Sequence, residues 1–286
     1  WGVWFPEDDK QVNWQTFLDE VAEAGYEVIE TGPFGFLPTD PEVLQAECAK
    51  RGIRVVAGTQ FGILHRPEAW EQTEREMRAN ASVLKAVGAH HLVYLPPMLR
   101  DLQTGGWAED PNLSDADWKL LAGNANRLGK LLKEDYDVTM VVHPHGDSHI
   151  ENCEQIDRFF AETDPEYVSF CLDTGHLEYG EVDTVDLIRS YPDRIGLVHI
   201  KQMDPEVVQR VRRENLSFGE AVSLGVCVTP DAGQPKVGAV IDALAALDKE
   251  LYVIVEQDLY PCAPDVPLPL AIETRRVLAD NHLGIH

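Results

Sequence analysis

Three histidines and two acidic residues lie within nine consecutive positions of the stretch Met140-Val-Val-His-Pro-His-Gly-Asp-Ser-His-Ile-Glu151. The stretch begins with an apolar run typical of a buried strand. Imidazoles transfer protons near neutral pH, and imidazoles combined with carboxylates bind divalent cations. The sequence therefore predicts a strand whose carboxyl end and following loop carry acid–base or metal-binding chemistry.

Other apolar runs of the chain end in the same kinds of residue. Their polar ends are Glu30, Asp173-Thr-Gly-His176, His199-Ile-Lys201 and Glu256-Gln-Asp258. One strand-end acid often caps the next helix, and one buried histidine is often a hydrogen-bonded core residue. Five such groups at one mouth would cost too much desolvation and repulsion without a cation. Together they predict a catalytic divalent metal with open positions, since Mn²⁺, Mg²⁺, Fe²⁺, Co²⁺ and Zn²⁺ all accept mixed N/O ligands.

The elements that must position these residues alternate between short apolar runs and longer amphipathic segments, which is typical of strand–helix units on a parallel sheet. Eight strands are expected, at residues 2–5, 26–30, 53–58, 91–95, 138–143, 168–173, 195–200 and 251–256. Eight units without a Pro-rich or Ser-rich linker predict an α/β fold with a single (β/α)8 TIM barrel over residues 1–286. A charged helical insertion is expected at about 204–225, after the seventh strand.

Composition excludes several classes of partner. The 49 Asp and Glu against 24 Lys and Arg give a net charge of −25, which repels nucleic acid and anionic membrane surfaces. The sequence contains no run of about twenty apolar residues, so no membrane span is predicted. The five cysteines form no Cys-x-x-Cys pair and are expected to be reduced thiols of a cytoplasmic protein. A homo-oligomer is compatible with this composition.

Three motifs carry a resemblance that covers essentially the whole chain. Cys171-Leu-Asp-Thr-Gly-His176, Ile195-Gly-Leu-Val-His-Ile-Lys201 and Val253-Ile-Val-Glu256 resemble the xylose isomerase-like barrels, and most of all their inosose dehydratase branch. The resemblance implies that Asp173, His199 and Glu256 bind one divalent metal, with Mn²⁺ as the expected ion. It also implies that Lys201 is a catalytic cation facing the substrate.

The sequence departs from this family at position 143. Many relatives have a metal-binding glutamate where His143 stands, followed two residues later by a histidine that matches His145. Either His143 has become the fourth ligand, or Glu151 folds back from the loop to supply the carboxylate. We expect Glu151, because three carboxylates and one imidazole keep the charge balance usual in the family. His143 and His145 would then be catalytic, and they share a strand face because they are two residues apart.

Four further residues are expected to bind the substrate: Glu30, Trp4, His176 and Trp107. Glu30 and His176 follow predicted strands, so they would lie at the barrel mouth. The two tryptophans could wall a pocket, although aromatic residues at such places often serve packing instead. The expected ligand is a small polyol or sugar ketone.

A metal beside a hydroxy-ketone would lower the pKa of the intervening C–H and stabilise an enediolate. Loss of a β-substituent would then make the protein a dehydratase or eliminase acting on a keto-cyclitol or keto-sugar. The alternative is a metal-dependent sugar isomerase or ketose epimerase, although His143 breaks the pair of facing glutamates that epimerases use. An endonuclease IV-like phosphodiesterase is a distant alternative, because its substrate needs a basic groove. A barrel that only binds sugar would not need the metal ligands.

Overall fold

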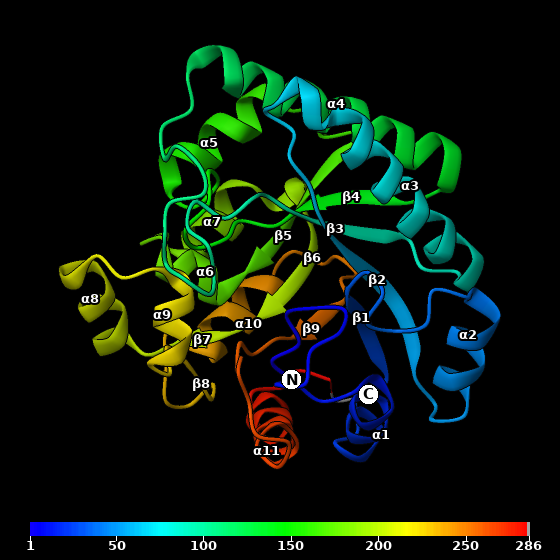
Figure 1. The fold of residues 1–286 in the computed structure, drawn as a ribbon. Coiled ribbons are helices and arrows are strands. Elements are labelled where there is room, and N and C mark those ends of the chain that lie inside the picture. Colours follow the sequence, from blue (N-terminus) through cyan, green and yellow to red (C-terminus); the bar gives the residue numbers. More distant parts are fainter. Residues whose placement is uncertain (285–286) are drawn as a thin grey trace.

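Seven parallel strands form the central sheet of the computed structural model, which describes residues 1–284 (Figure 1). In spatial order they are β1 (Val28–Pro33), β2 (Arg54–Phe61), β3 (His91–Leu95), β4 (Thr139–Val142), β5 (Val168–Asp173), β6 (Ile195–Ile200) and β9 (Val253–Val255). β9 also contacts β1, so the sheet closes almost completely. This arrangement confirms the predicted TIM-barrel fold.

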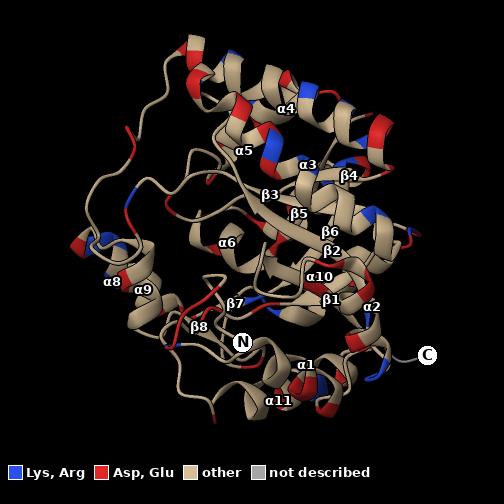
Figure 2. Ribbon diagram, turned by 45° about the vertical axis from the view of Figure 1, so that its right-hand side comes forward, with Lys and Arg blue, Asp and Glu red and all other residues tan. Residues whose placement is uncertain are grey.

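Helices surround the sheet on its outer side (Figure 1). They are α1 (Trp14–Glu23), α2 (Pro41–Ala49), α3 (Trp70–Val87), α4 (Asp115–Tyr136), α5 (Cys153–Glu162), α6 (Thr174–Tyr179), α7 (Thr184–Ser190), α10 (Val237–Ala245) and α11 (Pro267–Asp280). Asn13, Asp40 and Ser114 accept backbone N–H groups at the starts of α1, α2 and α4. Acidic residues are spread over these outer helices (Figure 2). Within residues 1–284, none of the helices combines the length and the apolar character that a membrane crossing requires.

Residues 2–5 were expected to form the first barrel strand, and this prediction is wrong. Gly2 has a φ of +65°, in the left-handed region, which interrupts an extended strand at its start. The segment instead lies beside the chain that follows β9, where the indole Nε1 of Trp4 donates to Asp258 Oδ1 at 3.0 Å. Trp4 thereby reaches the barrel mouth from a segment that contributes no strand to the sheet.

A small separate unit interrupts the chain between β6 and β9. It consists of β7 (Gln202–Met203), α8 (Pro205–Glu214), α9 (Phe218–Ser223) and β8 (Cys227–Val228), with β7 and β8 antiparallel. Its apolar side chains form their own cluster around Phe218, against which Met98 and Leu102 pack. Helices α8 and α9 thus occupy the segment in which the sequence predicted a helical insertion, on the left of Figure 1.

Candidate functional site

The side chains inside the barrel change from apolar to mostly polar between one inward-facing residue of each strand and the next, two positions later. An apolar layer is formed by Ala57, Val93, Val141, Cys171 and Leu197. Two residues later, on the same face of each strand, stand Thr59, Leu95, His143, Asp173 and His199. Glu256 follows β9 in the same way, two residues after Ile254, which packs on the apolar layer. The period of the strands therefore brings the predicted polar residues together above a closed floor.

Four of these residues place one ligand atom each within 4.8 Å of all the others: His143, Asp173, His199 and Glu256. Asp173 Oδ2 lies 3.3 Å from His143 Nε2 and 3.5 Å from His199 Nδ1. Glu256 Oε2 lies 3.1 Å from His199 Nδ1 and 4.0 Å from His143 Nε2. Such separations suit N and O ligands that each lie about 2.1 Å from a shared ion. This metal-ligand group therefore fits one divalent metal.

Cys171 lies close enough to His143 and His199 to form a second potential ligand set with them. Burial raises the pKa of the Cys171 thiol to about 12, so the sulfur stays protonated at neutral pH. Cys171 also belongs to the apolar layer that closes the floor of the site, and its set contains no carboxylate to offset the charge of an ion. The mixed N/O group is therefore the better candidate.

The charges of the group depend on one another. Burial opposes ionisation of Asp173, but Lys201 and His143 hold the pKa of its carboxyl well below the usual range. Burial likewise opposes a charge on His199, but the carboxylates of Glu30 and Glu256 raise the pKa of its imidazole well above the usual value. Binding of a metal at His199 would therefore release a proton, because the ligand must be neutral.

The structure does not bring Glu151 to this group. Its carboxyl lies in the loop before α5, where Asp147, Arg212 and Arg100 are the charged groups that act on it. His143 fills the fourth place instead, with its side chain only 2% exposed. The geometry thus favours the alternative in which the imidazole replaces the glutamate of many relatives.

Replacement of Glu151 by glutamine should raise stability at high pH. Burial raises the pKa of Glu151 to about 7, so the folded protein binds this proton more tightly than the unfolded chain does. Stability is then retained at low pH and lost as the pH rises from about 4.5 to 7, at a cost on the order of 3 kcal/mol. In urea unfolding, Glu151→Gln should increase the free energy of unfolding at pH 8 and change it little at pH 4.5. The exposed Glu154→Gln is the control, and equal effects of Glu151→Gln at both pH values would contradict the prediction.

His145 is placed for proton transfer. Its Nδ1 donates to the Gly146 carbonyl at 2.8 Å, which leaves Nε2 as the nitrogen able to accept a proton. Burial, together with the neighbouring His143 and Lys201, lowers the pKa of His145 to about 4. The imidazole is therefore neutral at pH 7, and it lines the central cavity.

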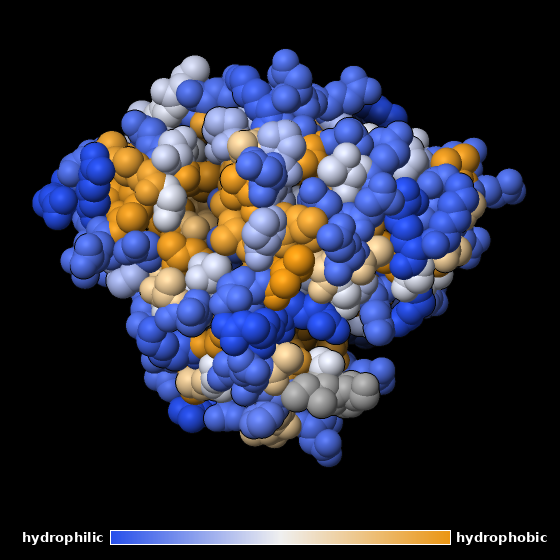
Figure 3. All heavy atoms as spheres, turned by 90° about the horizontal axis from the view of Figure 1, so that it is seen from below, coloured by the Kyte–Doolittle hydropathy of each residue, from blue (hydrophilic) through white to orange (hydrophobic). Residues whose placement is uncertain are grey.

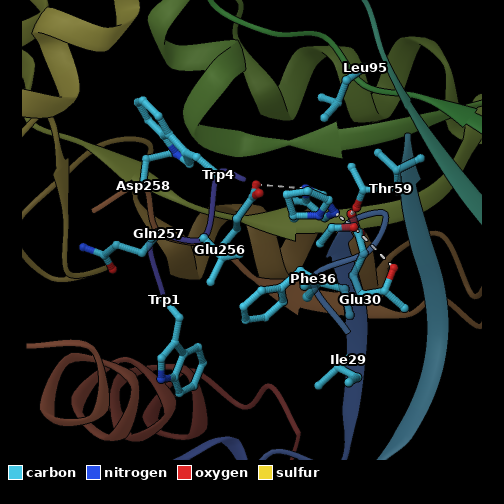
Figure 4. A pocket seen from close by; sticks show the side chains of 18 of the residues that line it. Trp1, Trp4, Ile29, Glu30, Phe36, Thr59, Leu95, Glu256, Gln257 and Asp258 are labelled. Carbon is cyan, nitrogen blue, oxygen red and sulfur yellow. Dashed lines mark hydrogen bonds and ion pairs between the residues drawn. The ribbon is translucent and has the colours of Figure 1, made fainter. Parts of the chain in front are cut away.

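The cavity has a volume of about 200 Å³, and residues at the carboxyl ends of several strands line it. Glu30, His145, Glu256 and Asp258 supply polar lining, and most of the remaining lining is apolar or aromatic. Glu30 and Glu256 reach the His199 ring from opposite sides, at 2.8 Å from Nε2 and 3.1 Å from Nδ1 (Figure 4). Hydrophobic side chains surround a hollow on one face of the molecule (Figure 3). A substrate in the cavity would therefore meet both charged groups and aromatic surface.

Three of the residues predicted to be catalytic or to bind the substrate do not line this cavity. His176 is buried behind His145, where its Nδ1 accepts from the Gly146 N–H at 3.0 Å and its ring centroid lies 3.8 Å from that of His145. Lys201 is also buried, behind Glu256 and Asp258. Trp107 is 59% exposed on the long loop after β3, where its ring contacts Arg100. His176 and Lys201 can therefore position other groups, whereas Trp107 lies away from the cavity lining.

Sequence reasoning missed a buried ion pair that fixes the cavity wall. Arg100 Nε lies 2.9 Å from both carboxylate oxygens of Asp147, and its other nitrogens donate to the carbonyls of Asn215 and Leu216. Asp147 Oδ2 also accepts the N–H of Phe218, whose ring packs on His145. The partners lie far apart in the sequence, so no local motif could have revealed the pair. Asp258 stood in one of the polar strand ends but was given no role, although its place two residues after Glu256 was a signal.

Comparison with known proteins agrees with the barrel fold. A profile of the xylose isomerase-like TIM barrel matches residues 18–278. An inosose dehydratase of Geobacillus thermodenitrificans is 30% identical over 279 residues, which cover 96% of this chain and 92% of the relative. Two solved structures share the fold at 16% identity and a TM-score of 0.71: the E. coli 3-keto-D-glucoside 4-epimerase (96% of this chain, 97% of the other) and the IolI protein with a bound zinc atom (96% of each). The chain is therefore an enzyme that belongs to the xylose isomerase-like TIM-barrel family.

Proposed function

We propose that the protein is a divalent-metal-dependent lyase that removes water, or a related β-leaving group, from a keto-cyclitol or keto-sugar. The observation that carries the proposal is the position of His145 in the cavity wall beside the metal-ligand group. The inosose dehydratase name of the relatives supports the dehydratase assignment. A sugar- or cyclitol-sized ketone also suits a cavity of about 200 Å³.

His143, Asp173, His199 and Glu256 would hold the ion. When bound, the ion supplies a Lewis acid that stabilises negative charge on the substrate oxygens next to the reacting carbon. Mn²⁺ is the ion we propose, because the two carboxylate oxygens of the group suit it. The solved zinc-bound IolI protein shows that a barrel of this fold can hold a divalent ion.

His145 would accept the proton from the carbon next to the carbonyl through its Nε2. The electron pair of that C–H bond forms the new C=C bond while the C–O bond at the β-carbon breaks. The imidazolium of His145 then returns its proton to the leaving hydroxyl, so that water departs. Glu30, Asp258 and the aromatic side chains that line the cavity would orient the ring of the substrate so that the reacting C–H faces His145.

An isomerase or epimerase is the second candidate, because the same proton abstraction would precede return of the proton to carbon. The imidazole at position 143 supports the lyase, since it replaces one of the two facing glutamates expected of a ketose epimerase. The metal-ligand group alone is compatible with both reactions.

Product analysis in D₂O separates these reactions. We expect the Mn²⁺-loaded protein to convert 2-keto-myo-inositol to an unsaturated ketone that absorbs in the near ultraviolet, with release of water. A 3-keto-glucoside tested in parallel should release its aglycone if the protein is an eliminase. Recovered substrate or isomer that carries deuterium, without an unsaturated product from either compound, would contradict the lyase and support the isomerase or epimerase. Asp173→Asn is the matched control for metal-dependent turnover.

A further inference from the structure

Lys201 approaches the same oxygen atoms that the metal-ligand group offers to an ion. Its ammonium nitrogen lies 2.9 Å from Glu256 Oε2 and 3.4 Å from Asp173 Oδ2. The side chain is 1% exposed, so solvent screens this charge little. A fixed positive charge therefore already stands beside the position of the ion.

The surroundings of Lys201 keep the ammonium at this place. Asp258 Oδ2 lies 2.8 Å and His176 Nε2 lies 3.0 Å from Nζ. The Thr174 hydroxyl pairs with both backbone groups of Lys201, at 2.9 Å from its nitrogen and 2.5 Å from its oxygen. A Cβ at Gly175 would lie 2.6 Å from Cγ of Lys201, so the stem is packed closely on that side. These contacts hold the ammonium against the metal-ligand group.

Four carboxylates gather at this end of the barrel: Asp173, Glu256, Asp258 and Glu30. Without a metal, Lys201 offsets part of their mutual repulsion. With a metal, Lys201 and the ion become like charges that share two carboxylate oxygens. The same side chain thus stabilises the unloaded site and opposes loading.

We propose that Lys201 is a fixed counter-cation that holds the metal-ligand group together in the unloaded enzyme and weakens its affinity for divalent ions, with Asp258 limiting this effect. This inference rests on the metal site of the proposed function. It makes Lys201 a positioning residue that acts through Asp173 and Glu256, in place of the substrate contact expected from the sequence.

Two substitutions should change metal affinity in opposite directions. Lys201→Met removes a positive charge close to the ion and should bind Mn²⁺ at least about tenfold more tightly than the parent. Asp258→Asn removes a partner of Lys201 and a nearby negative charge, and should bind Mn²⁺ several-fold more weakly. Lys249→Met is the matched control, because its ammonium bonds to the Ile195 carbonyl at the start of β6 and its loss should leave the affinity unchanged.

The test is a titration of chelator-treated protein with Mn²⁺ alone, in competition with a fluorescent chelator at fixed pH and ionic strength. Thermal unfolding gives a second measurement, in which Lys201→Met should melt earlier without metal and gain more from Mn²⁺ than the parent. Equal or weaker binding by Lys201→Met would overturn the inference while the metal site stands. If Lys201→Met cannot be isolated without metal, unchanged or tighter binding by Asp258→Asn overturns it. A parent protein that binds no divalent ion would overturn the metal site as well.

Discussion

Asp173→Asn and Glu256→Gln are expected to abolish tight binding of the divalent ion, whereas the parent should hold about one ion per chain. Each substitution replaces a charged ligand oxygen by a neutral amide that keeps the shape of the side chain. An amide oxygen carries less negative charge, so the affinity should fall by about 100-fold or more. Elemental analysis after dialysis, followed by titration with Mn²⁺, checks the result. Retention of the parent metal content by both variants would disprove the proposed site.

The same titration identifies the fourth ligand. Because His143 Nε2 lies 3.3 Å from Asp173 Oδ2, His143→Ala should lose metal affinity nearly as strongly as the carboxylate variants. Glu151→Gln should bind the ion as the parent does, because Glu151 lies outside the metal-ligand group. A loss of affinity in Glu151→Gln with normal binding by His143→Ala would restore the ligand set expected from the sequence.

The position of the polar residues at the strand ends followed from the sequence for a physical reason. A strand turns its side chains to alternate faces, so an inward apolar residue such as Val141 or Leu197 places the residue two positions later inward as well. His143 and His199 are those residues, and parallel strands bring them to one mouth. Strand period and barrel closure therefore account for most of the candidate site.

Residues on loops could not be placed in this way. Glu151 follows Asp147, which has a left-handed φ of +66° and is held by Arg100, 47 positions earlier in the chain. That long-range pair sets the path of the loop and carries Glu151 away from the ligands. Trp107 lies on the loop that also holds Arg100, and its exposure likewise depends on contacts between distant segments.

The first segment shows a different limit. Trp1-Gly-Val-Trp-Phe has the composition of a strand, yet Gly2 takes a left-handed backbone conformation that residues with side chains rarely adopt. A Cβ at Gly2 would lie 2.9 Å from the backbone of Leu259, so the close approach of these two segments requires glycine. The sequence alone shows the glycine but gives no sign of the segment that approaches it.

His145→Asn is expected to slow turnover by about 10²- to 10⁴-fold, the usual cost of losing a general base. Asparagine places its amide near the position of Nδ1, where it can keep the hydrogen bond to Gly146, but it has no basic nitrogen at the position of Nε2. The hydrogen bond from His145 Nδ1 to the Gly146 carbonyl orients the imidazole without using Nε2, so the loss should fall on kcat more than on KM. The assay is steady-state turnover of whichever substrate gives product, with metal content measured on the same samples.

Two comparisons separate this role from a structural one. His90→Asn is the control, because His90 is 58% exposed at the opposite end of the barrel, just before β3. Its turnover and metal content should match those of the parent. His145→Asn should also keep the parent metal content, since His145 is outside the metal-ligand group. Full turnover by His145→Asn with the ion bound would remove His145 from the mechanism. Glu30, whose carboxylate lines the cavity beside His199, would then be the next candidate for the base.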